Sequence, residues 1–415
     1  AMKGTVVLPK SIEPVKDDRN AIDEALKYPV GSPPLNQIAH RGQRVCIVFT
    51  DITRSSPDHL LVPALLAELK QCGVRDGHIT LLCGVGMHRP STHDEKVNKL
   101  GRAIVKRYRV KDNEPENSNE LVNLGTTTRG VPVLVHRAAV EADLVITTGI
   151  VEPHLYAGYS GGWKTLAIGA AGEATIAHTH GPIFVDHPGT RLGSIAGNPF
   201  HQAIEEVARM SGLSFIVNVV LDEQKRILRV AAGDPESAFM ELVRFARSVY
   251  EVPIDHQYDI VIGGVGYPKD SNLYQASRAP TYLFFAPIPV VRPGGFLIIP
   301  ALCEEGAGHG VGEQRFLAAM REAVNIETIL QDSRLYGYPP GQQRAFVLAK
   351  VLEKSQIVIV GSQTPGIVAD CKMIPAETMQ EALVLAEERF GRSCQVLIVP
   401  HAMHTLPVIQ NENSS

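Results

Sequence analysis

The chain contains a short, unbroken apolar run at Val45-Cys46-Ile47-Val48-Phe49, followed by an amphipathic stretch from Asp58 to Cys72. Two further apolar runs, Ile79–Cys83 and Leu144–Thr148, are likewise separated by helical patterns. Strands that are apolar on both faces and alternate with helices are typical of a parallel sheet covered by helices on each side. The sequence therefore predicts an α/β fold of the doubly wound kind.

The same alternation restarts after Pro253-Ile254-Asp255-His256, which we interpret as a hinge. A chain of 415 residues also exceeds what one compact core usually holds. We therefore expect two α/β domains with mainly parallel sheets, an N-terminal one over 1–252 and a C-terminal one over 253–401. The tail of about 402–415 is expected to pack back on the N-terminal domain. Ligands of such folds bind at the carboxyl ends of strands, so we expect the site in an interdomain cleft.

Composition and charge exclude several classes of function. Forty Lys and Arg residues against 44 Asp and Glu residues give a net charge of −4, whereas a general grip on nucleic acid needs a basic surplus. The longest apolar runs, such as Phe296–Ile299, are far too short to span a membrane. Six scattered cysteines without a CxxC pair indicate thiols in a reducing compartment, and the first residues lack a secretory pattern. We expect a cytoplasmic protein that binds neither nucleic acid nor membrane.

Polar residues come directly after each of the first three predicted strands. The segments are Asp51-Ile52-Thr53-Arg54, Gly86-Met87-His88-Arg89-Pro90 and Glu152-Pro153-His154. Loops that leave the carboxyl ends of parallel strands lie at one edge of the sheet, which is the ligand side in open α/β folds. A single histidine at a strand end is more often structural than functional. Two of them, accompanied by an aspartate and an arginine, favour a functional site.

The segment Asp51–Pro57 also suits an anion. Ser55 or Ser56 is expected to cap the following helix, with Pro57 at its first position, so that main-chain N–H groups face a ligand. Arg54 adds a forked donor for a carboxylate or phosphate. The alternative interpretation, a well-capped helix with a surface arginine, fits this segment equally well.

A glycine-rich stretch, Gly158-Tyr159-Ser160-Gly161-Gly162-Trp163-Lys164, allows close approach of the main chain to a bulky ligand, although it is neither a Walker A motif nor GxGxxG. Lys164 is either a solvated lysine or one that bonds covalently to a cofactor. Downstream, His178-Thr179-His180 suits a metal if the segment is a strand. If it is a helix, the two imidazoles point apart and only one serves.

Taken together, these segments resemble the lactate racemase family, whose members use a nickel-pincer nucleotide. The resemblance runs in order through the three strand-end segments, the stretch from Glu152 to Lys164, and His180. It continues through Gly266-Tyr267-Pro268-Lys269-Asp270 and Asn272-Leu273-Tyr274-Gln275, and it spans about 40–350. The string from Glu152 to Lys164 is specific enough to make chance similarity improbable.

The resemblance implies a role for each matching position. It assigns cofactor contact to Asp51, Ile52, Thr53 and Arg54, acid/base catalysis to His88 and His154, a covalent bond to the cofactor to Lys164, nickel ligation to His180, and substrate binding to Arg54, Gln275 and Arg278. The implied cofactor is Ni(II)-pyridinium-3,5-bisthiocarboxylate mononucleotide, held in the N-terminal domain and supplied by dedicated biosynthetic enzymes. The implied substrate is a small 2-hydroxy acid, over which the C-terminal domain closes.

Three positions depart from the family pattern. Trp163 stands where the family commonly has arginine, and Arg278 where the lactate enzyme has lysine. The lactate enzyme also carries a tryptophan in its second domain, in a region where this chain has Gly341-Gln342-Gln343-Arg344. These differences suggest a substrate larger or more polar than lactate.

The implied chemistry is a racemisation or epimerisation. The α-hydrogen of a 2-hydroxy acid is poorly acidic, but it leaves as hydride once a base takes the hydroxyl proton, and a planar keto acid results. Return of the hydride to either face requires one base for each enantiomer, which His88 and His154 provide. A nicotinamide-dependent dehydrogenase is the main alternative, but the first strand is not followed by GxGxxG. A non-catalytic nickel- or nucleotide-binding protein is the other, and the presence of both histidines argues against it.

Overall fold

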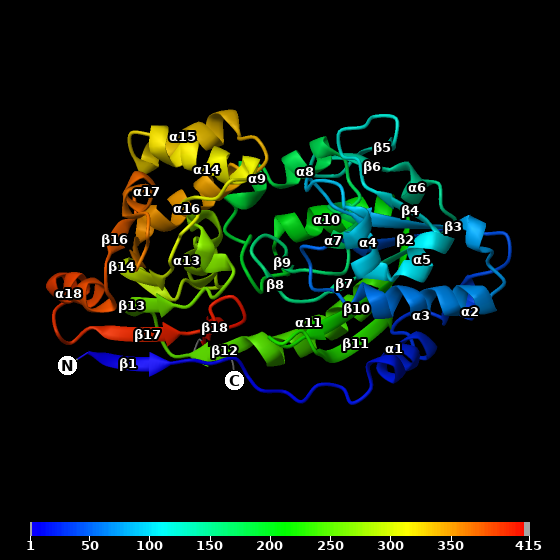
Figure 1. Cartoon of the computed structure of the whole chain (residues 1–415), viewed down its shortest axis with the longest axis horizontal. Coiled ribbons are helices and arrows are strands. Elements are labelled where there is room, and N and C mark those ends of the chain that lie inside the picture. The colour runs from blue at the N-terminus through cyan, green and yellow to red at the C-terminus, as the bar shows by residue number, and fades with distance from the viewer. Residues whose placement is uncertain (1, 411–415) are drawn as a thin grey trace. The chain divides into compact units, whose positions relative to one another are not determined.

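The structure, a computed structural model, describes residues 2–410 and divides into two compact units (Figure 1). The N-terminal unit consists of Ser11–His180 and Ile195–Val249. The C-terminal unit consists of the chain before Ser11, Gly181–Ser194, and the chain from Tyr250 onward. Each unit contains a six-stranded, mainly parallel sheet with helices packed against it, which confirms the predicted α/β class.

The sheet of the N-terminal unit has the strand order β11-β10-β7-β2-β3-β4. Every neighbouring pair is parallel except β10 and β11, which are antiparallel. The three apolar runs of the sequence form the adjacent strands β7, β2 and β3 at its centre. The strands are β2 (Val45–Thr50), β3 (Ile79–Gly84), β4 (Arg109–Asp112), β7 (Leu144–Ile150), β10 (Leu213–Leu221) and β11 (Ile227–Gly233), with two small antiparallel pairs, β5 (Leu121–Thr126) with β6 (Pro132–His136) and β8 (Pro153–His154) with β9 (Gly158–Tyr159).

Helices cover both faces of this sheet because its central strands are apolar on both sides. Val45, Ile47 and Phe49 of β2 pack with Leu61 and Leu65 of the helix that comes after it, in one hydrophobic cluster. Full burial of each such side chain contributes about 1.5–3 kcal/mol to the stability of the folded state. The helices of the unit are α1 (Asp18–Lys27), α2 (Leu35–Ile38), α3 (Asp58–Gln71), η1 (Asp76–His78), α4 (His93–Leu100), α5 (Arg102–Arg107), α6 (Arg137–Val140), α7 (Lys164–Ala167), α8 (Glu173–Thr179), α10 (Pro199–Met210) and α11 (Pro235–Tyr250).

The sheet of the C-terminal unit has the order β1-β17-β13-β14-β15-β16, and all its neighbouring pairs are parallel. Its strands are β1 (Lys3–Val6), β13 (Tyr258–Gly263), β14 (Val291–Pro300), β15 (Gln356–Val360), β16 (Ile374–Ala376) and β17 (Gln395–Val399), and a separate parallel pair joins β12 (Glu251–Ile254) to β18 (Leu406–Ile409). Its helices are α9 (Pro182–Val185), η2 (Lys269–Ser271), α12 (Leu273–Ala276), α13 (Arg278–Phe284), α14 (Val311–Glu322), α15 (Ile326–Tyr336), α16 (Gln343–Lys354), α17 (Pro365–Asp370) and α18 (Met379–Phe390).

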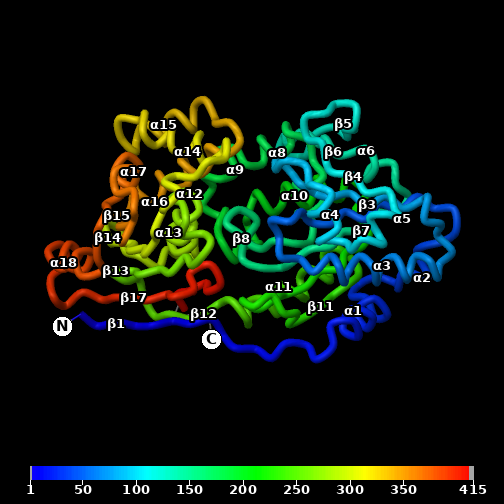
Figure 2. Tube along the Cα trace, viewed as in Figure 1, coloured from blue at the N-terminus to red at the C-terminus, as the bar shows by residue number. Residues whose placement is uncertain are grey.

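The division of the chain differs from the predicted boundaries at three places. The first residues belong to the C-terminal unit, because β1 pairs with β17 and the Val7 N–H donates to the Ile398 carbonyl at 2.9 Å (Figure 2). The segment Gly181–Ser194 belongs there too, since Asp186 forms ion pairs with Lys350 at 2.8 Å and with Arg334 at 2.9 Å. The tail was predicted to pack on the N-terminal domain, whereas β18 pairs with β12 in the C-terminal unit. Asn411–Ser415 lie outside the described residues.

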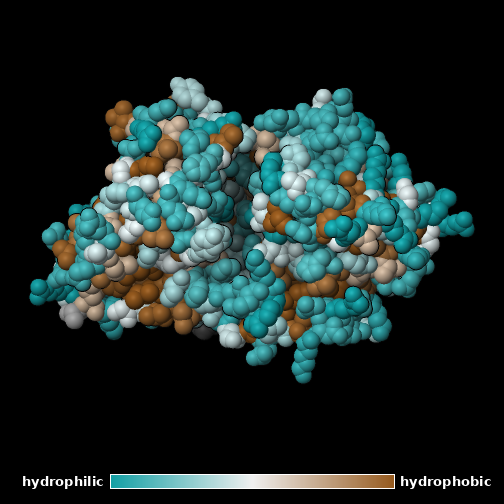
Figure 3. Space-filling model, in the orientation of Figure 1, coloured by the Kyte–Doolittle hydropathy of each residue, from teal (hydrophilic) through white to brown (hydrophobic). Residues whose placement is uncertain are grey.

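The surface of each unit is largely polar. Figure 3 shows hydrophilic side chains over most of the visible face of each unit, with hydrophobic ones in scattered groups. Within residues 2–410, every helix falls short of the length and apolar character that a membrane crossing needs.

Candidate functional site

The three predicted strand-end segments leave the sheet of the N-terminal unit at one edge. Strands β7, β2 and β3 are neighbours, with Thr50 paired to Gly84 and Val48 to Thr147. Because all three run parallel, the residues after Thr50, Gly84 and Ile150 emerge on the same side. The structure therefore brings together the segments that carry Asp51, His88 and His154.

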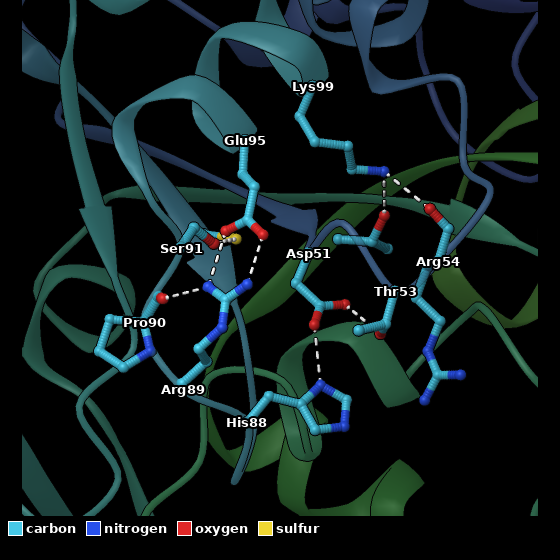
Figure 4. A network of polar contacts seen from close by, with 11 residues as sticks. Asp51, Thr53, Arg54, His88, Arg89, Pro90, Ser91, Glu95 and Lys99 are labelled. Carbon is cyan, nitrogen blue, oxygen red and sulfur yellow. Dashed lines mark hydrogen bonds and ion pairs between the residues drawn. The ribbon is translucent and has the colours of Figure 1, made fainter. Parts of the chain in front are cut away.

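Asp51 and His88 form the first pair of the site (Figure 4). The His88 Nδ1 lies 2.8 Å from Asp51 Oδ2, and the Thr53 hydroxyl donates to Asp51 Oδ1 at 2.8 Å. Burial of the carboxyl raises the pKa of Asp51, but the hydrogen bonds from His88 and Thr53 and the charge of Arg54 hold it below its ordinary value. The ionised carboxylate thus accepts from the His88 Nδ1–H, which leaves the lone pair of the neutral ring on Nε2. His88 is arranged as a proton acceptor.

His154 has the opposite arrangement. It lies on β8, and its Nδ1 accepts hydrogen bonds from the main-chain N–H groups of Tyr156 at 3.3 Å and Ala157 at 3.2 Å. A neutral imidazole that accepts at Nδ1 carries its proton on Nε2. Nε2 of neutral His154 therefore carries a hydrogen, whereas Nε2 of neutral His88 carries a lone pair.

Lys164 is the first residue of α7 and is half-buried. Burial and the positive charge of Arg54 lower the pKa of Lys164 to about 7, while the carboxylates of Glu152 and Asp51 oppose this shift. A large fraction of the amine is therefore neutral near pH 7, which makes it a nucleophile.

The glycines before Lys164 serve internal packing. A Cβ at Gly161, whose φ is +78°, would lie 2.7 Å from Asn218 Oδ1, and one at Gly162 would lie 2.7 Å from the ring of Phe239. A larger residue at Gly161 or Gly162 would therefore clash with atoms of the protein. We predicted instead that these glycines give room to a ligand. These residues fix the main chain at the start of α7, and the side-chain Oδ1 of Asn218 accepts from the Gly162 N–H at 2.7 Å.

His180 comes directly after α8 and is half-buried. Burial lowers the pKa of His180 to about 4, so the ring is neutral near pH 7. Its Nδ1 lies 2.9 Å from the Ile176 carbonyl oxygen, which fixes the proton on Nδ1 and leaves Nε2 as the nitrogen with a metal-binding lone pair. His178 lies within the helix, so the helical alternative for His178-Thr179-His180 applies.

Aromatic contacts connect the two histidine regions. The ring of Tyr156 lies 5.9 Å from that of His154 and 5.4 Å from that of His180, edge-on in both cases. Phe200 contacts both rings, with its centroid 5.1 Å from that of His180 and 5.8 Å from that of Tyr156. Tyr156 thus fixes the spacing between a predicted acid/base residue and the predicted metal ligand.

The groups that the N-terminal unit offers to a metal fit one that is already coordinated by a cofactor. Within residues 2–410 there is no group of three or more His, Cys, Asp or Glu side chains that could hold a metal ion. His180 supplies one neutral nitrogen, and Lys164 supplies one neutral amine for a covalent bond. A cofactor that carries further metal donors and an electrophilic carbon matches both groups.

The predicted cap of α3 is wrong. We expected Ser55 or Ser56 to cap this helix with Pro57 at its first position, but α3 begins at Asp58 and no side chain caps it. The fully buried Asp58 carboxylate occupies the first turn and accepts from the Ser56 hydroxyl at 3.0 Å. This carboxylate is paired with Lys99 Nζ at 2.8 Å, so Asp58 and not a serine shapes the start of α3.

Trp163, directly before Lys164, is a buried anchor. The Arg209 guanidinium lies over its ring, with Cζ 4.7 Å from the centroid. Arg209 is also ion-paired with Glu205 of α10 at 3.0 Å and with Glu236 of α11 at 2.7 Å. This stack joins the start of α7 to two helices of the N-terminal unit.

Gln275 and Arg278 lie in the C-terminal unit, on α12 and α13. The two short helices are separated at Ser277. The Arg278 Nε donates to Gln275 Oε1 at 2.8 Å, so the two predicted substrate-binding residues contact each other.

Comparisons with known proteins identify the family. Residues 2–193 match the lactate racemase N-terminal domain, and residues 254–406 match the lactate racemase C-terminal domain. A lactate racemase from Lactiplantibacillus plantarum is 32% identical over 389 residues, which are 93% of this chain and 90% of that protein. The chain belongs to the lactate racemase family. It is accordingly an isomerase of the racemase type.

Solved structures of other proteins share the fold of this chain. The lactate racemase apoprotein from Thermoanaerobacterium thermosaccharolyticum superposes with a TM-score of 0.85 at 28% identity, covering 96% of this chain and 94% of that one. A protein from Thermotoga maritima, 18% identical, shares the fold with a TM-score of 0.68 over 94% of this chain and 98% of that one.

Three residues that shape the site of this lactate racemase family member are not found by sequence reasoning. Tyr156 lies inside the recognised string from Glu152 to Lys164, but nothing in the string marks its contacts with two histidines. Asp58 and Lys99 form a buried ion pair, with 2.8 Å between Lys99 Nζ and Asp58 Oδ2. They are 41 positions apart, so no local pattern indicates that they meet.

Proposed function

We propose that this protein racemises or epimerises a 2-hydroxy acid with the aid of a nickel-pincer nucleotide. Lys164 would bind the cofactor covalently, and His180 would ligate its nickel. The observation that carries the proposal is that two imidazoles in different hydrogen-bonding environments follow strands that end at one edge of the sheet, because interconversion of two enantiomers needs one group that accepts a proton and one that supplies it.

The two histidines would exchange roles with the direction of the reaction. The cofactor, when bound through Lys164 and His180, would supply a reversible acceptor for the α-hydrogen of the substrate as hydride. His88 Nε2, with its lone pair, would accept the hydroxyl proton of one enantiomer, and His154 in its doubly protonated, imidazolium form would supply from Nε2 the proton that forms the hydroxyl of the other. After turnover His88 is protonated and His154 is not, which is the starting state for the reverse direction. Asp51, Ile52, Thr53 and Arg54 would contact the cofactor, and Arg54 also the substrate.

We propose that Gln275 and Arg278, with Arg54, bind the carboxylate of the substrate. A second cation close to this pair supports a substrate larger or more polar than lactate. Arg344 is only 6% exposed, and within residues 2–410 its Nε has no hydrogen-bond partner. Its Nη1 donates to the Thr281 hydroxyl at 3.2 Å, and that hydroxyl donates to the Arg278 carbonyl at 2.8 Å. A buried guanidinium with unused donors is costly unless an anionic or polar group of a ligand binds it.

The cofactor requirement implies partners and a compartment. The cofactor would be delivered by its biosynthetic enzymes, so expression without them is expected to leave Lys164 unmodified. We propose a cytoplasmic location, which the six free cysteine thiols support.

The decisive experiment is co-expression with the cofactor's biosynthetic enzymes, then measurement of intact mass, peptide mapping and nickel analysis. We expect added mass on Lys164 and about one nickel per chain, and no addition to a Lys164→Ala variant. The loaded protein is then tested with D and L forms of lactate, of longer hydroxy acids and of hydroxy dicarboxylic acids. An unmodified Lys164, or no interconversion across this panel, would contradict the proposal. Interconversion of lactate alone would contradict the larger substrate.

A further inference from the structure

Helix α4 holds the loop that carries His88. The Arg89 guanidinium, next to His88, forms a two-pronged ion pair with Glu95 of α4, at 2.8 Å and 2.5 Å (Figure 4). The same Glu95 carboxylate accepts from the Thr92 N–H at 2.8 Å and completes the cap of the helix. The position of the His88 loop is therefore tied to the N-terminal half of α4.

One turn later, the same helix holds the loop that carries Asp51. Lys99 is 7% exposed, and its Nζ donates to the Thr50 hydroxyl at 3.0 Å, the Arg54 carbonyl at 3.1 Å and the Ser56 carbonyl at 2.9 Å. It also pairs with the buried Asp58 carboxylate at 2.8 Å. One main-chain acceptor of Lys99, the Arg54 carbonyl, lies in the turn that presents Asp51 and Thr53. The other, the Ser56 carbonyl, lies directly after that turn.

The Asp58 carboxylate completes this network. It accepts from the hydroxyls of Thr50 at 2.7 Å, Ser56 at 3.0 Å and Thr148 at 2.6 Å, in addition to pairing with Lys99. Thr148 lies on β7, whose end leads to His154. A buried ion pair contributes little net stability compared with apolar residues, so its value here is the geometry that it imposes on the loop.

We propose that α4 is the template that sets His88 against Asp51, with Glu95 and Lys99 as its positioning residues. The two residues are four apart and therefore lie on one side of the helix, about 6 Å along its axis. Each ties down one loop, and the 2.8 Å contact of His88 Nδ1 with Asp51 Oδ2 joins the two loops. The consequence for catalysis rests on the proposed function, whereas the positioning itself is a property of the apoprotein.

The test uses Lys99→Met and the matched control Lys96→Met on the same helix. Lys96 is also ion-paired, with 2.5 Å between its Nζ and Asp112 Oδ2, but Asp112 ends β4 and belongs to neither loop. Hydrogen exchange of the apoprotein, resolved by segment, is expected to rise over 51–57 in Lys99→Met and to stay unchanged there in Lys96→Met. A third variant, Glu95→Gln, is expected to raise hydrogen exchange over 85–92. This variant leaves the buried Lys99–Asp58 ion pair intact.

In the loaded enzyme, we expect kcat to fall by about 10²-fold in Lys99→Met, with a smaller change in KM, because a displacement of about 1 Å in catalytic geometry has an effect of this size. Equal exchange in the Lys99→Met and Lys96→Met apoproteins would overturn the proposal, as would unchanged kcat in Lys99→Met. If Lys99→Met does not fold, Glu95→Gln decides through exchange over 85–92. Loop-specific exchange combined with an inactive wild-type enzyme would contradict the proposed function and leave the template intact.

Discussion

His88 and His154 present the same side chain in two contrasting settings. The His88 ring is 49% exposed on a loop and donates to a carboxylate that is 6% exposed. His154 is half-buried in a two-stranded hairpin and accepts from two main-chain N–H groups. The sheet brings both to one edge, but the local hydrogen bonds decide where each ring holds its proton. Placement and protonation are thus controlled by different parts of the structure.

The strongest test of this comparison replaces each histidine by asparagine. We expect kcat to fall by about 10²–10⁴-fold in His88→Asn and in His154→Asn, and by a similar factor in both directions, because each direction uses both rings. His40→Asn is the control, since His40 is exposed and precedes β2 at the opposite edge of the sheet. Turnover that survives either substitution at the site would remove that histidine from the mechanism.

Asp51→Asn changes the hydrogen bonding of His88 and leaves that of His154 as it is. The amide keeps the shape of the side chain but removes the charge that fixes the Nδ1 proton of His88. By analogy with other partners that orient a functional histidine, we expect kcat to fall by about 10–100-fold. Thr53→Val, which removes one hydrogen bond to Asp51, is expected to have a smaller effect. If Thr53→Val were the more damaging change, the carboxylate would not be the group that orients His88.

Lys164 is influenced by charges from both histidine loops, in opposite directions. Arg54 lies after β2 and lowers the pKa of Lys164, whereas Glu152 lies after β7 and raises it. Arg54→Met is therefore expected to move the midpoint for amine modification of Lys164 above about 7, and Glu152→Gln to move it below. Mass spectrometry of the apoprotein after labelling at a series of pH values measures both midpoints. Shifts in the same direction would show that the Lys164 pKa responds to altered packing and not to charge.

The smallest expected effect concerns stability against pH. The pKa of Asp51 is lower in the folded protein than its ordinary value of 3.8, so the ionised carboxylate stabilises the fold above that pH. This contribution is lost as the pH falls through the folded-state pKa. The difference in Tm between the wild type and Asp51→Asn should therefore shrink below about pH 4. A difference that grows in acid would contradict the hydrogen bonding derived for Asp51 and His88.

The sequence predicts the parts of the fold that depend on local pattern. Strands β2, β3 and β7 are found because each is an uninterrupted buried run. The edge strand β1 is missed because all its residues are exposed and show no apolar period. The prediction that Ser55 or Ser56 caps α3 is wrong because the Ser56 hydroxyl donates to the buried Asp58 carboxylate. Asp58 is the first residue of the helix.

The same distinction holds at the site. That the segments carrying His88 and His154 leave the sheet at one edge results from the order of parallel strands, and this part is predictable. The location of their protons depends on Asp51 Oδ2 and on the main chain at Tyr156 and Ala157, which no spacing in the sequence reveals. The Asp58–Lys99 pair is equally hidden, because an isolated lysine near the end of an amphipathic helix resembles a solvated one.

The interleaving of the two units along the chain has a practical consequence for dissecting the protein. The polypeptide passes from one unit to the other four times, at 10/11, 180/181, 194/195 and 249/250. No single cut yields two intact halves: a fragment spanning 11–249 would carry Gly181–Ser194 without the partners of Asp186, and a fragment starting at 250 would leave the edge of β17 bare where β1 belongs. Domain expression would therefore need a short linker replacing 181–194 in one half and β1 grafted onto the other, and an affinity tag is better fused away from that first strand.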